Sequence, residues 1–349
     1  MISGNTNTET NGDNNATFGN LNQITRTSNS IAGGKSNTIT DSSNCQVTGD
    51  TNSSNNVDNS ITIGKSNSIT DVSNTAIFGL SHQVKTTTLN SIVSGKSHIE
   101  TTGTNNALFG EEHETTSTSN TLSTGKNHTV TTGNQSLISG KDNTGGTITN
   151  VFVTGESNNI SNSTNTSVLG KSMAITGNNN SFLTGMSNGE TNGNQNALFG
   201  ESNTTNNSNN TMVGGKSNAV ATTERNITFG LSNNVTNGSD NITVGQSNTV
   251  LDTSYSGIIG KSHDISSNTV GTLSVGKSHK ELKGRFNITG GESNQIVNSS
   301  NMTIGGLSNK MVDGSNNLIQ GRQNDLTNVY NSGVTGKEHT VTNNQHTAV

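Results

Sequence analysis

Hydrophobic and polar positions recur along this chain with a period of fifteen residues, and a glycine marks each repeat. The marker occurs at 23 positions, and its spacing is 15 residues except between Gly79 and Gly95 and between Gly260 and Gly276, where it is 16. A fixed period is the signature of a solenoid, in which each repeat forms one coil that stacks on its neighbours. We expect these glycines to occupy tight turns, where φ > 0 or close packing is needed. Representative members are Gly34, Gly64, Gly95, Gly125, Gly155, Gly185, Gly215, Gly245, Gly276, Gly306 and Gly336.

Each repeat contains two short segments with strand character. The residue three before the marker is usually apolar, and the residue five after it is usually β-branched or leucine, as in Ile31 and Ile39. Apolar residues at alternating positions are typical of strands, and no helical 3.6-residue pattern is present. The sequence predicts an all-β fold, a parallel β-solenoid of the β-roll type, with about 23 coils of 15 residues and two short strands per coil. We expect a single continuous repeat domain over residues 1–349 without evident caps.

Composition explains how so polar a chain can fold in this way. Hydrophobic residues make up 25% of the chain, against about 45–50% in an ordinary globular domain. A thin core built coil by coil needs few apolar residues, and the complete absence of proline fits strands whose backbone N–H groups are all paired. The formal charge of −5 gives no nucleic-acid footprint, and no apolar run is long enough to span a membrane. The single cysteine, Cys45, excludes an internal disulfide, and we interpret it as an outward-facing replacement for serine.

Asparagine or histidine occupies the third position after most markers. Residues at one repeat position stack along a solenoid, so we expect side-chain amides to pair from coil to coil. Stacked imidazoles could bind a metal ion, but asparagine replaces histidine freely, so hydrogen bonding is the shared property. We therefore predict no metal site, no cofactor and no catalytic residues. The row comprises Asn37, Asn67, His82, His98, His113, His128, Asn158, Asn218, Asn248, His263 and His279.

The position two before the marker is also rich in Val, Leu and Ile. If the residue three before the marker points inward, this neighbouring position points outward and forms an exposed apolar stripe. Such a stripe normally marks an interaction surface, which predicts self-association. The alternative is that the strand is shifted by one residue and this position is core. The proposed stripe comprises Val47, Ile77, Val93, Leu108, Ile138, Val153, Val168, Leu183, Leu198, Val213, Ile258, Ile304, Ile319 and Val334.

Two families share the glycine-centred pattern. The segment 59–67, Asn-Ser-Ile-Thr-Ile-Gly-Lys-Ser-Asn, resembles the head repeats of YadA-like trimeric adhesins. The segment 120–130, Asn-Thr-Leu-Ser-Thr-Gly-Lys-Asn-His-Thr-Val, is also similar to the β-roll repeats of grass ice-binding proteins. The adhesin resemblance implies a left-handed parallel β-roll that forms a homotrimer. The repeat is longer than that of the adhesin head, and neither a coiled-coil stalk nor a secretion signal is visible.

The leading hypothesis is a structural fibre or spike shaft. We expect a rigid, self-associating rod, trimeric or stacked head to tail as a filament, on the outside of a cell or virion, with adhesion as one output. Repeat character runs from Met1 to Val349, which indicates either such head-to-tail stacking or a segment of a longer repeat protein.

An ice-binding protein is the alternative function. Outward threonine pairs beside the second strand, such as Thr38 and Thr40, would supply a flat face, although Gln83 and Lys85 interrupt it. Lysine is frequent directly after the marker and could hold acidic surface glycans, or it could simply solubilise a corner. We expect no enzyme, no nucleic-acid partner and no membrane span.

Overall fold

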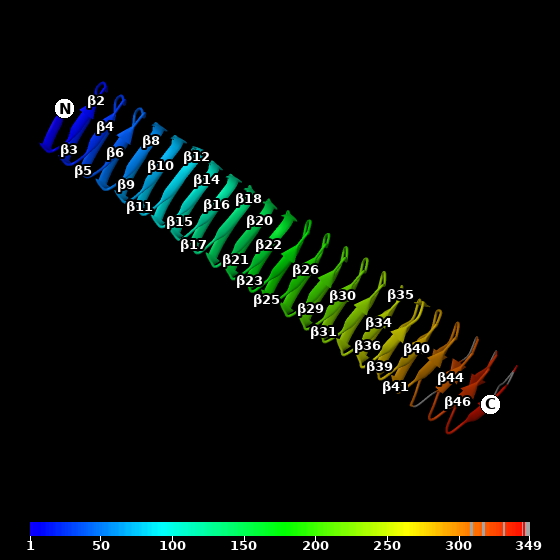
Figure 1. Ribbon diagram of the computed structural model, residues 1–349. Helices are drawn as coiled ribbons and strands as arrows, with labels where there is room; N and C mark the ends of the chain where they lie inside the picture. Colours follow the sequence, from blue (N-terminus) through cyan, green and yellow to red (C-terminus); the bar gives the residue numbers. More distant parts are fainter. Residues whose placement is uncertain (308–309, 316–317, 331, 344, 346–349) are drawn as a thin grey trace. The chain divides into compact units, whose positions relative to one another are not determined.

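The protein is an all-β parallel β-solenoid. The computed structural model describes residues 1–307, 310–315, 318–330, 332–343 and 345, so Val349, where the repeat pattern ends, lies outside the described residues. Coils with two rows of strands make about 22 turns, and the described residues contain no helix (Figure 1). The predicted fold class is confirmed. The chain divides into two compact units, Met1–Thr176 and Gly177–Val349.

In the first unit, one sheet contains the marker glycines and a second sheet follows them. The glycine-containing sheet comprises β1 (Ile2–Asn5), β3 (Ala16–Asn20), β5 (Ile31–Lys35), β7 (Gln46–Asp50), β9 (Ile61–Lys65), β11 (Ala76–Leu80), β13 (Ile92–Lys96), β15 (Ala107–Glu111), β17 (Leu122–Lys126), β19 (Leu137–Lys141), β21 (Phe152–Glu156) and β23 (Ser167–Lys171). The second sheet comprises β2 (Thr8–Thr10), β4 (Gln23–Thr25), β6 (Thr38–Thr40), β8 (Ser53–Asp58), β10 (Ser68–Ser73), β12 (Gln83–Leu89), β14 (Ile99–Thr104), β16 (Glu114–Ser119), β18 (Thr129–Asn134), β20 (Thr144–Thr149), β22 (Asn159–Thr164) and β24 (Ala174–Thr176).

The second unit repeats this arrangement with shorter strands. Its glycine-containing sheet comprises β25 (Phe182–Met186), β27 (Ala197–Glu201), β29 (Met212–Lys216), β31 (Ile227–Leu231), β33 (Ile242–Gln246), β36 (Gly257–Lys261), β39 (Leu273–Lys277), β41 (Ile288–Glu292), β43 (Thr303–Ile304), β45 (Leu318–Ile319) and β47 (Gly333–Val334). Its second sheet comprises β26 (Gly189–Thr191), β28 (Thr204–Asn206), β30 (Ala219–Ala221), β32 (Asn234–Thr236), β34 (Thr249–Leu251), β37 (Asp264–Ser266), β40 (Lys280–Leu282), β42 (Gln295–Val297), β44 (Lys310–Val312), β46 (Asp325–Thr327) and β48 (Thr340–Thr342). A short third pair joins β35 (Thr253–Ser254) to β38 (Thr269–Val270).

Strand pairing follows the sequence period. Within each unit, strands are parallel to the equivalent strand one coil later, so that marker glycine lies beside marker glycine, as for Gly34 and Gly49 in β5 and β7. All eleven representative marker glycines have φ between +99° and +141°. A Cβ atom built on Gly140 would lie 2.0 Å from the carbonyl oxygen of Gly155 in the next coil. Only a residue without a side chain fits this contact and this backbone conformation.

Five positions of a coil point into a narrow core. In the coil around Gly49 they are Cys45, Val47, Asn52, Ser54 and Val57, which are 3%, 0%, 1%, 1% and 1% exposed. They stand four and two residues before the marker and three, five and eight residues after it. The core is therefore partly polar, and its polar members need hydrogen-bond partners inside the coil stack.

The structure corrects the predicted exposed stripe. All fourteen of its residues, from Val47 to Val334, are at most 2% exposed, so they form core rather than an outer surface. Residues one place earlier, such as Ile31 and Ile61, are the exposed ones at 41% each. The strand is thus shifted by one residue from the first assignment, and a one-residue shift exchanges the two faces of a strand. Cys45 likewise points inward, with its Sγ 3.1 Å from the carbonyl oxygen of Val57.

The two sixteen-residue coils place their extra residue at one corner. In ordinary coils, the residue seven after the marker has a positive φ. In the two long coils, two successive residues have a positive φ at this corner: Thr86 and Thr87 in one, and Ser267 and Asn268 in the other. The strand register shifts at this point in the second sheet, between β10 and β12. The glycine-containing strands β11 and β13 stay in register, because the corner absorbs the insertion.

Candidate functional site

The outer side of the glycine-containing sheet is apolar along both units. Residues three and one before each marker point outward there, and we call this surface the apolar face. Some large members, such as Leu137 and Phe199, are half-buried, and eighteen others are between 37% and 51% exposed. In the first unit they are Phe18, Ile31, Ile61, Ile63, Phe78, Ile92, Phe109, Leu122 and Phe152. In the second unit they are Phe182, Met212, Ile227, Ile242, Ile259, Leu273, Val275, Ile288 and Leu318.

Side-chain sizes on the apolar face compensate across each coil. Where the residue three before the marker is large, the residue one before it is usually Gly, Ser or Thr, as in the pairs Ile31/Gly33 and Ile92/Ser94. Where the first residue is alanine, the second is phenylalanine, as in Ala107/Phe109. Most coils therefore contribute one large side chain and one small one. The large side chain is at one position in some coils and at the other position in others, so apolar side chains spread over the width of the face.

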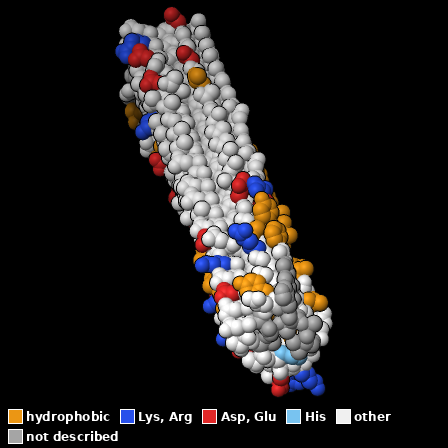
Figure 2. All heavy atoms as spheres, turned by 90° about the vertical axis from the view of Figure 1, so that its right-hand side faces the viewer, with side chains coloured by type: hydrophobic (Ala, Val, Ile, Leu, Met, Phe, Trp, Pro, Cys, Tyr) orange, Lys and Arg blue, Asp and Glu red, His pale blue; other side chains and the backbone are white. Residues whose placement is uncertain are grey.

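A row of charged side chains follows the apolar face at the position directly after the marker. Acidic residues that interrupt the lysine row pair with lysines of adjacent coils: Lys126 Nζ lies 3.0 Å from a carboxylate oxygen of Glu111, and Lys96 lies 3.5 Å from the other. Lys171 pairs with Glu156 in the same way at 3.1 Å. The position keeps eleven Lys or Arg residues against five acidic ones, so the row retains a net positive charge, and exposed ion pairs of this kind contribute little energy. In the view of Figure 2, most of the surface is neither hydrophobic nor charged, and the hydrophobic side chains have charged side chains directly beside them.

Inside the coils, asparagines three after the marker hydrogen-bond to the backbone and to the asparagine at the same position of an adjacent coil. Asn37 Nδ2 donates to the carbonyl oxygens of Gly33 and Gly49 and to Asn22 Oδ1, at 2.7, 3.0 and 3.1 Å. Asn37 Oδ1 accepts from the backbone N–H of Asn52 at 3.0 Å. Each side chain thus closes its own corner and connects two coils. The same pattern repeats in the second unit at Asn218 and Asn233.

The histidines of this row take the same role as asparagine. The ring centroids of His82, His98, His113 and His128 follow one another at 4.9, 4.7 and 4.8 Å. His98 Nε2 lies 3.0 Å from the carbonyl oxygen of Ser94, and its Nδ1 accepts from the backbone N–H of His113 at 3.1 Å. Nδ1 is therefore unprotonated and Nε2 carries the hydrogen. Burial lowers the pKa of His98 and His113 to about 4.

Metal binding would break these contacts. Both ring nitrogens of His98 already have backbone partners, and a metal ligand needs a free lone pair. Among the described residues, no cluster of three or more His, Cys, Asp or Glu side chains has metal-binding geometry.

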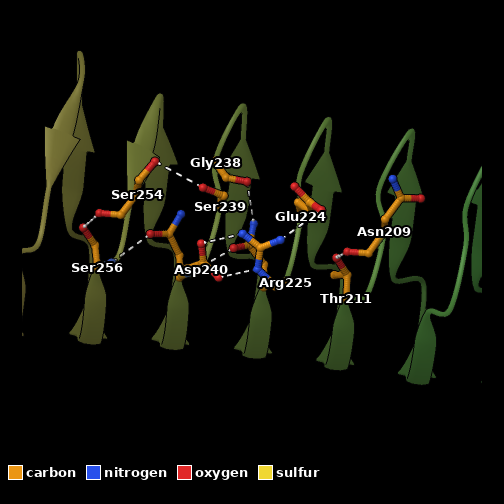
Figure 3. Close-up of polar contacts among 11 residues, drawn as sticks. Asn209, Thr211, Glu224, Arg225, Gly238, Ser239, Asp240, Ser254 and Ser256 are labelled. Carbon is orange, nitrogen blue, oxygen red and sulfur yellow. Dashed lines mark hydrogen bonds and ion pairs between the residues drawn. The ribbon is translucent and has the colours of Figure 1, made fainter.

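A shallow hollow of ≈ 460 Å³ in the second unit is lined by Glu224, Gly238, Ser239, Ser254 and neighbouring polar residues. Figure 3 shows the polar contacts beside it. Beside it, Arg225 donates from Nε and Nη2 to both carboxylate oxygens of Asp240, at 2.6 and 2.9 Å, and its Nη1 lies 2.9 Å from Glu224. Asp240 in turn has its pKa lowered, mainly by the hydrogen bond from Arg225. The charges satisfy one another, and the remaining lining is Asn, Thr, Gly and Ser. This hollow therefore lacks a paired acid and base or an activated nucleophile.

Sequence reasoning missed a set of buried glutamates. Glu100, Glu190 and Glu281 are 0%, 1% and 1% exposed and occupy the inward position five after the marker, where most coils have an apolar or hydroxyl side chain. Each belongs to the motif Glu-x-x-Gly-x-x-Asn. The spacing of this motif, rather than the composition, was the signal that could have revealed them.

Comparison with known proteins does not identify a family. No family model matches the chain, and no curated protein matches it. One solved structure, described as a "putative acetyltransferase from Desulfovibrio desulfuricans G20", is 7% identical, with a TM-score of 0.12, over 66% of this chain and 63% of that one. The chain thus covers less than two thirds of that structure. A similarity this weak carries no argument about fold or activity.

No helix in the described part of the chain is long and apolar enough to cross a membrane.

Proposed function

We propose that this chain is a structural, non-enzymatic β-solenoid that self-associates through the apolar face. It would serve as a rigid fibre or spike shaft on a cell or virion, where adhesion is one possible output. The apolar face is the observation that carries the proposal. A surface of ordered, periodically spaced large apolar side chains is costly to leave in water and marks an interaction site.

The available area is large enough for a stable interface. Nine large side chains of the apolar face are exposed by about 40% in the first unit, and each of them presents roughly 80 Å². Together they offer roughly 700 Å² in that unit, close to the roughly 800 Å² that each partner contributes to a standard protein interface. Intervening threonine and serine residues add to this contact.

A second copy of the chain is the partner that fits best. Its large side chains recur with the same coil spacing, so side chains of one copy can pack between those of another over many coils. At several coils the lysine beside the face pairs with an acidic residue of an adjacent coil, which lowers the charge repulsion between two copies. A homotrimer around the apolar face agrees with the resemblance to adhesin head repeats.

The test is to place charges on the apolar face and measure assembly. We expect the wild-type chain to sediment as an oligomer and the Ile92→Lys/Leu122→Lys variant to sediment as a monomer, because charges would be buried in the interface. Thr116→Lys/Thr131→Lys, on the outer side of the second sheet of the same unit, is the matched control and should still associate. A monomeric wild-type chain at high concentration, or equal association of both variants, would contradict the proposal.

Ice binding has weaker support as the second candidate. The outer side of the second sheet carries Thr38 and Thr40 in β6, but Lys85 and Asp264 interrupt the equivalent positions in β12 and β37. A regular ice-binding face would need uniform flat side chains. Thermal hysteresis in a solution of the wild-type chain would revive this function, and its absence would remove it.

A further inference from the structure

The Glu-x-x-Gly-x-x-Asn motif recurs at every sixth coil. It occupies residues 9–15, 100–106, 190–196 and 281–287, so that successive glutamates are 91, 90 and 91 residues apart. Each unit of the fold contains two copies. The sequence therefore has a second, longer period of six coils in addition to the fifteen-residue period. It places one inward glutamate in every sixth coil.

Each fully buried motif has the same geometry. Glu190 Oε1 accepts a hydrogen bond from Asn196 Nδ2 at 2.6 Å and from Ser181 Oγ at 3.1 Å. Asn196 also donates to the carbonyl oxygen of Ser208 at 2.6 Å, and its Oδ1 accepts from the backbone N–H of Thr211 at 2.9 Å. One carboxyl group thus holds side chains that connect three successive coils.

The other two buried motifs repeat these contacts. Glu100 accepts from Ser91 and Asn106, at 3.0 and 2.8 Å. Glu281 accepts from Thr272 and Asn287, at 2.9 and 2.6 Å. The shared arrangement shows that the motif is a defined structural unit.

The glycine of the motif makes room for the carboxyl group. A Cβ atom on Gly193 would lie 2.0 Å from Glu190 Oε1 and 2.5 Å from Asn196 Nδ2. At Gly103 and Gly284 the corresponding distances to the glutamate oxygen are 2.0 and 1.7 Å. Glutamate and glycine are therefore present together for a steric reason.

The carboxyl group has no compensating charge. Glu190 Oε2 is buried without a hydrogen-bond partner, as are the Oε2 atoms of Glu100 and Glu281. Within residues 177–211, all of which the structure describes, the other ionisable side chain is Glu201, at an outer corner and 3.1 Å from Lys216. Burial raises the pKa of Glu190 to about 7, although the hydrogen bonds from Asn196 and Ser181 have the opposite, smaller effect of lowering this pKa. The low-dielectric core favours the neutral acid.

We propose that the three buried glutamate motifs, at residues 100–106, 190–196 and 281–287, are proton-operated joints, at which adjacent coils are held together by a neutral carboxylic acid and loosen when it ionises. An ionised Glu190 would be a buried charge without a cation, which a protein core tolerates poorly. The coils could relieve it by opening and hydrating the carboxylate. Because the motifs are six coils apart, opening at one joint would leave the coils between joints intact. This inference does not depend on the self-association proposed above.

Amide hydrogen exchange of the full chain can test the joint at Glu190. The Thr211 N–H, which binds Asn196, reports on the joint, and the Ile242 N–H, bonded to Ser256, is a reference outside it. After correction for intrinsic exchange, we expect the opening constant at Thr211 to rise at least about tenfold from pH 5 to pH 8. The Ile242 value should change by less than about threefold.

The variant Glu190→Gln keeps the shape but cannot ionise. It should abolish the pH dependence at Thr211, whereas Glu201→Gln, the exposed matched control, should retain it. Equal pH dependence in the wild-type chain and Glu190→Gln would overturn the proposal. Should Glu190→Gln fail to fold, titration of the Glu190 carboxyl ¹³C signal in the wild-type chain decides instead. A midpoint near the ordinary 4.5 would overturn the proposal, and one near 7 would support it.

Discussion

At the marker positions, glycine is required for two separate reasons. The backbone has a positive φ that residues with a side chain rarely adopt, and the carbonyl oxygen of the next coil fills the place of a Cβ. Some other glycines of the chain have neither constraint. Gly146, for example, has its nearest neighbour 4.0 Å from a built Cβ. The period visible in the sequence is therefore a direct record of contacts between coils.

Alanine substitution should separate these two kinds of glycine. We expect Gly140→Ala to lower the free energy of unfolding of its unit by at least about 3 kcal/mol, because it combines backbone strain with a steric overlap. Gly146→Ala should change it by less than about 1 kcal/mol. Urea unfolding followed by circular dichroism measures both. Similar losses in the two variants would show that the marker contact is not the constraint.

The strand elements show how far sequence reasoning could reach. The fifteen-residue period predicted the stacking and the register, because pairing between equal positions follows from repetition alone. The phase of the glycine-containing strand was wrong, since Ile31 on its outer side is as apolar as Val47 on its inner side. Alternation alone cannot choose between two apolar faces. The usable signal was size: the inner position never carries an aromatic residue, because the core is narrow, whereas Phe109 and others occur on the outer side.

The histidine row should make the first unit sensitive to acid. Burial lowers the pKa of His98 and His113 to about 4, from an ordinary value of about 6.5. The unfolded chain therefore binds protons that the folded one excludes. The resulting stability is present above pH 6.5 and is lost as the pH falls toward 4, by up to about 3 kcal/mol for each histidine.

Replacing the two histidines tests this pH dependence. His98→Asn/His113→Asn, which installs the residue that occupies this position in other coils, should reduce the loss of stability between pH 7 and pH 4.5. Thermal unfolding of both proteins at several pH values provides the measurement. An unchanged slope in the double variant would mean that these imidazoles do not control the acid response.

At the scale of the whole molecule, apolar and charged surfaces are placed differently. The apolar face lies on the outer side of the glycine-containing sheet, and the paired charges follow it along the corner after the marker. The side chains that the sequence suggested for the association surface, such as Val93, are buried within the coils. They therefore contribute little to association. Self-association would therefore depend on apolar contact and only weakly on charge.

Salt should separate these two contributions. Exposed ion pairs are screened at high ionic strength, whereas burial of apolar surface is not. We expect the oligomer of the wild-type chain to persist or strengthen between 0.05 and 0.5 M NaCl (concentrations chosen to span roughly a threefold change in Debye length), as followed by sedimentation velocity. Dissociation of the oligomer at the higher NaCl concentration would indicate instead that the charged row forms the interface.

The two long coils have a consequence for changes in chain length. An extra residue at the corner near Thr86 and Thr87 leaves the neighbouring strands β11 and β13 in register, so this corner can tolerate insertions that the glycine-containing strand cannot. Residues can be inserted at this corner during evolution without loss of the fold. In the glycine-containing strand, residues would have to be gained or lost as whole coils to keep the register. The same corner is a natural position for grafting a peptide epitope, with copies available at regular intervals along a display scaffold.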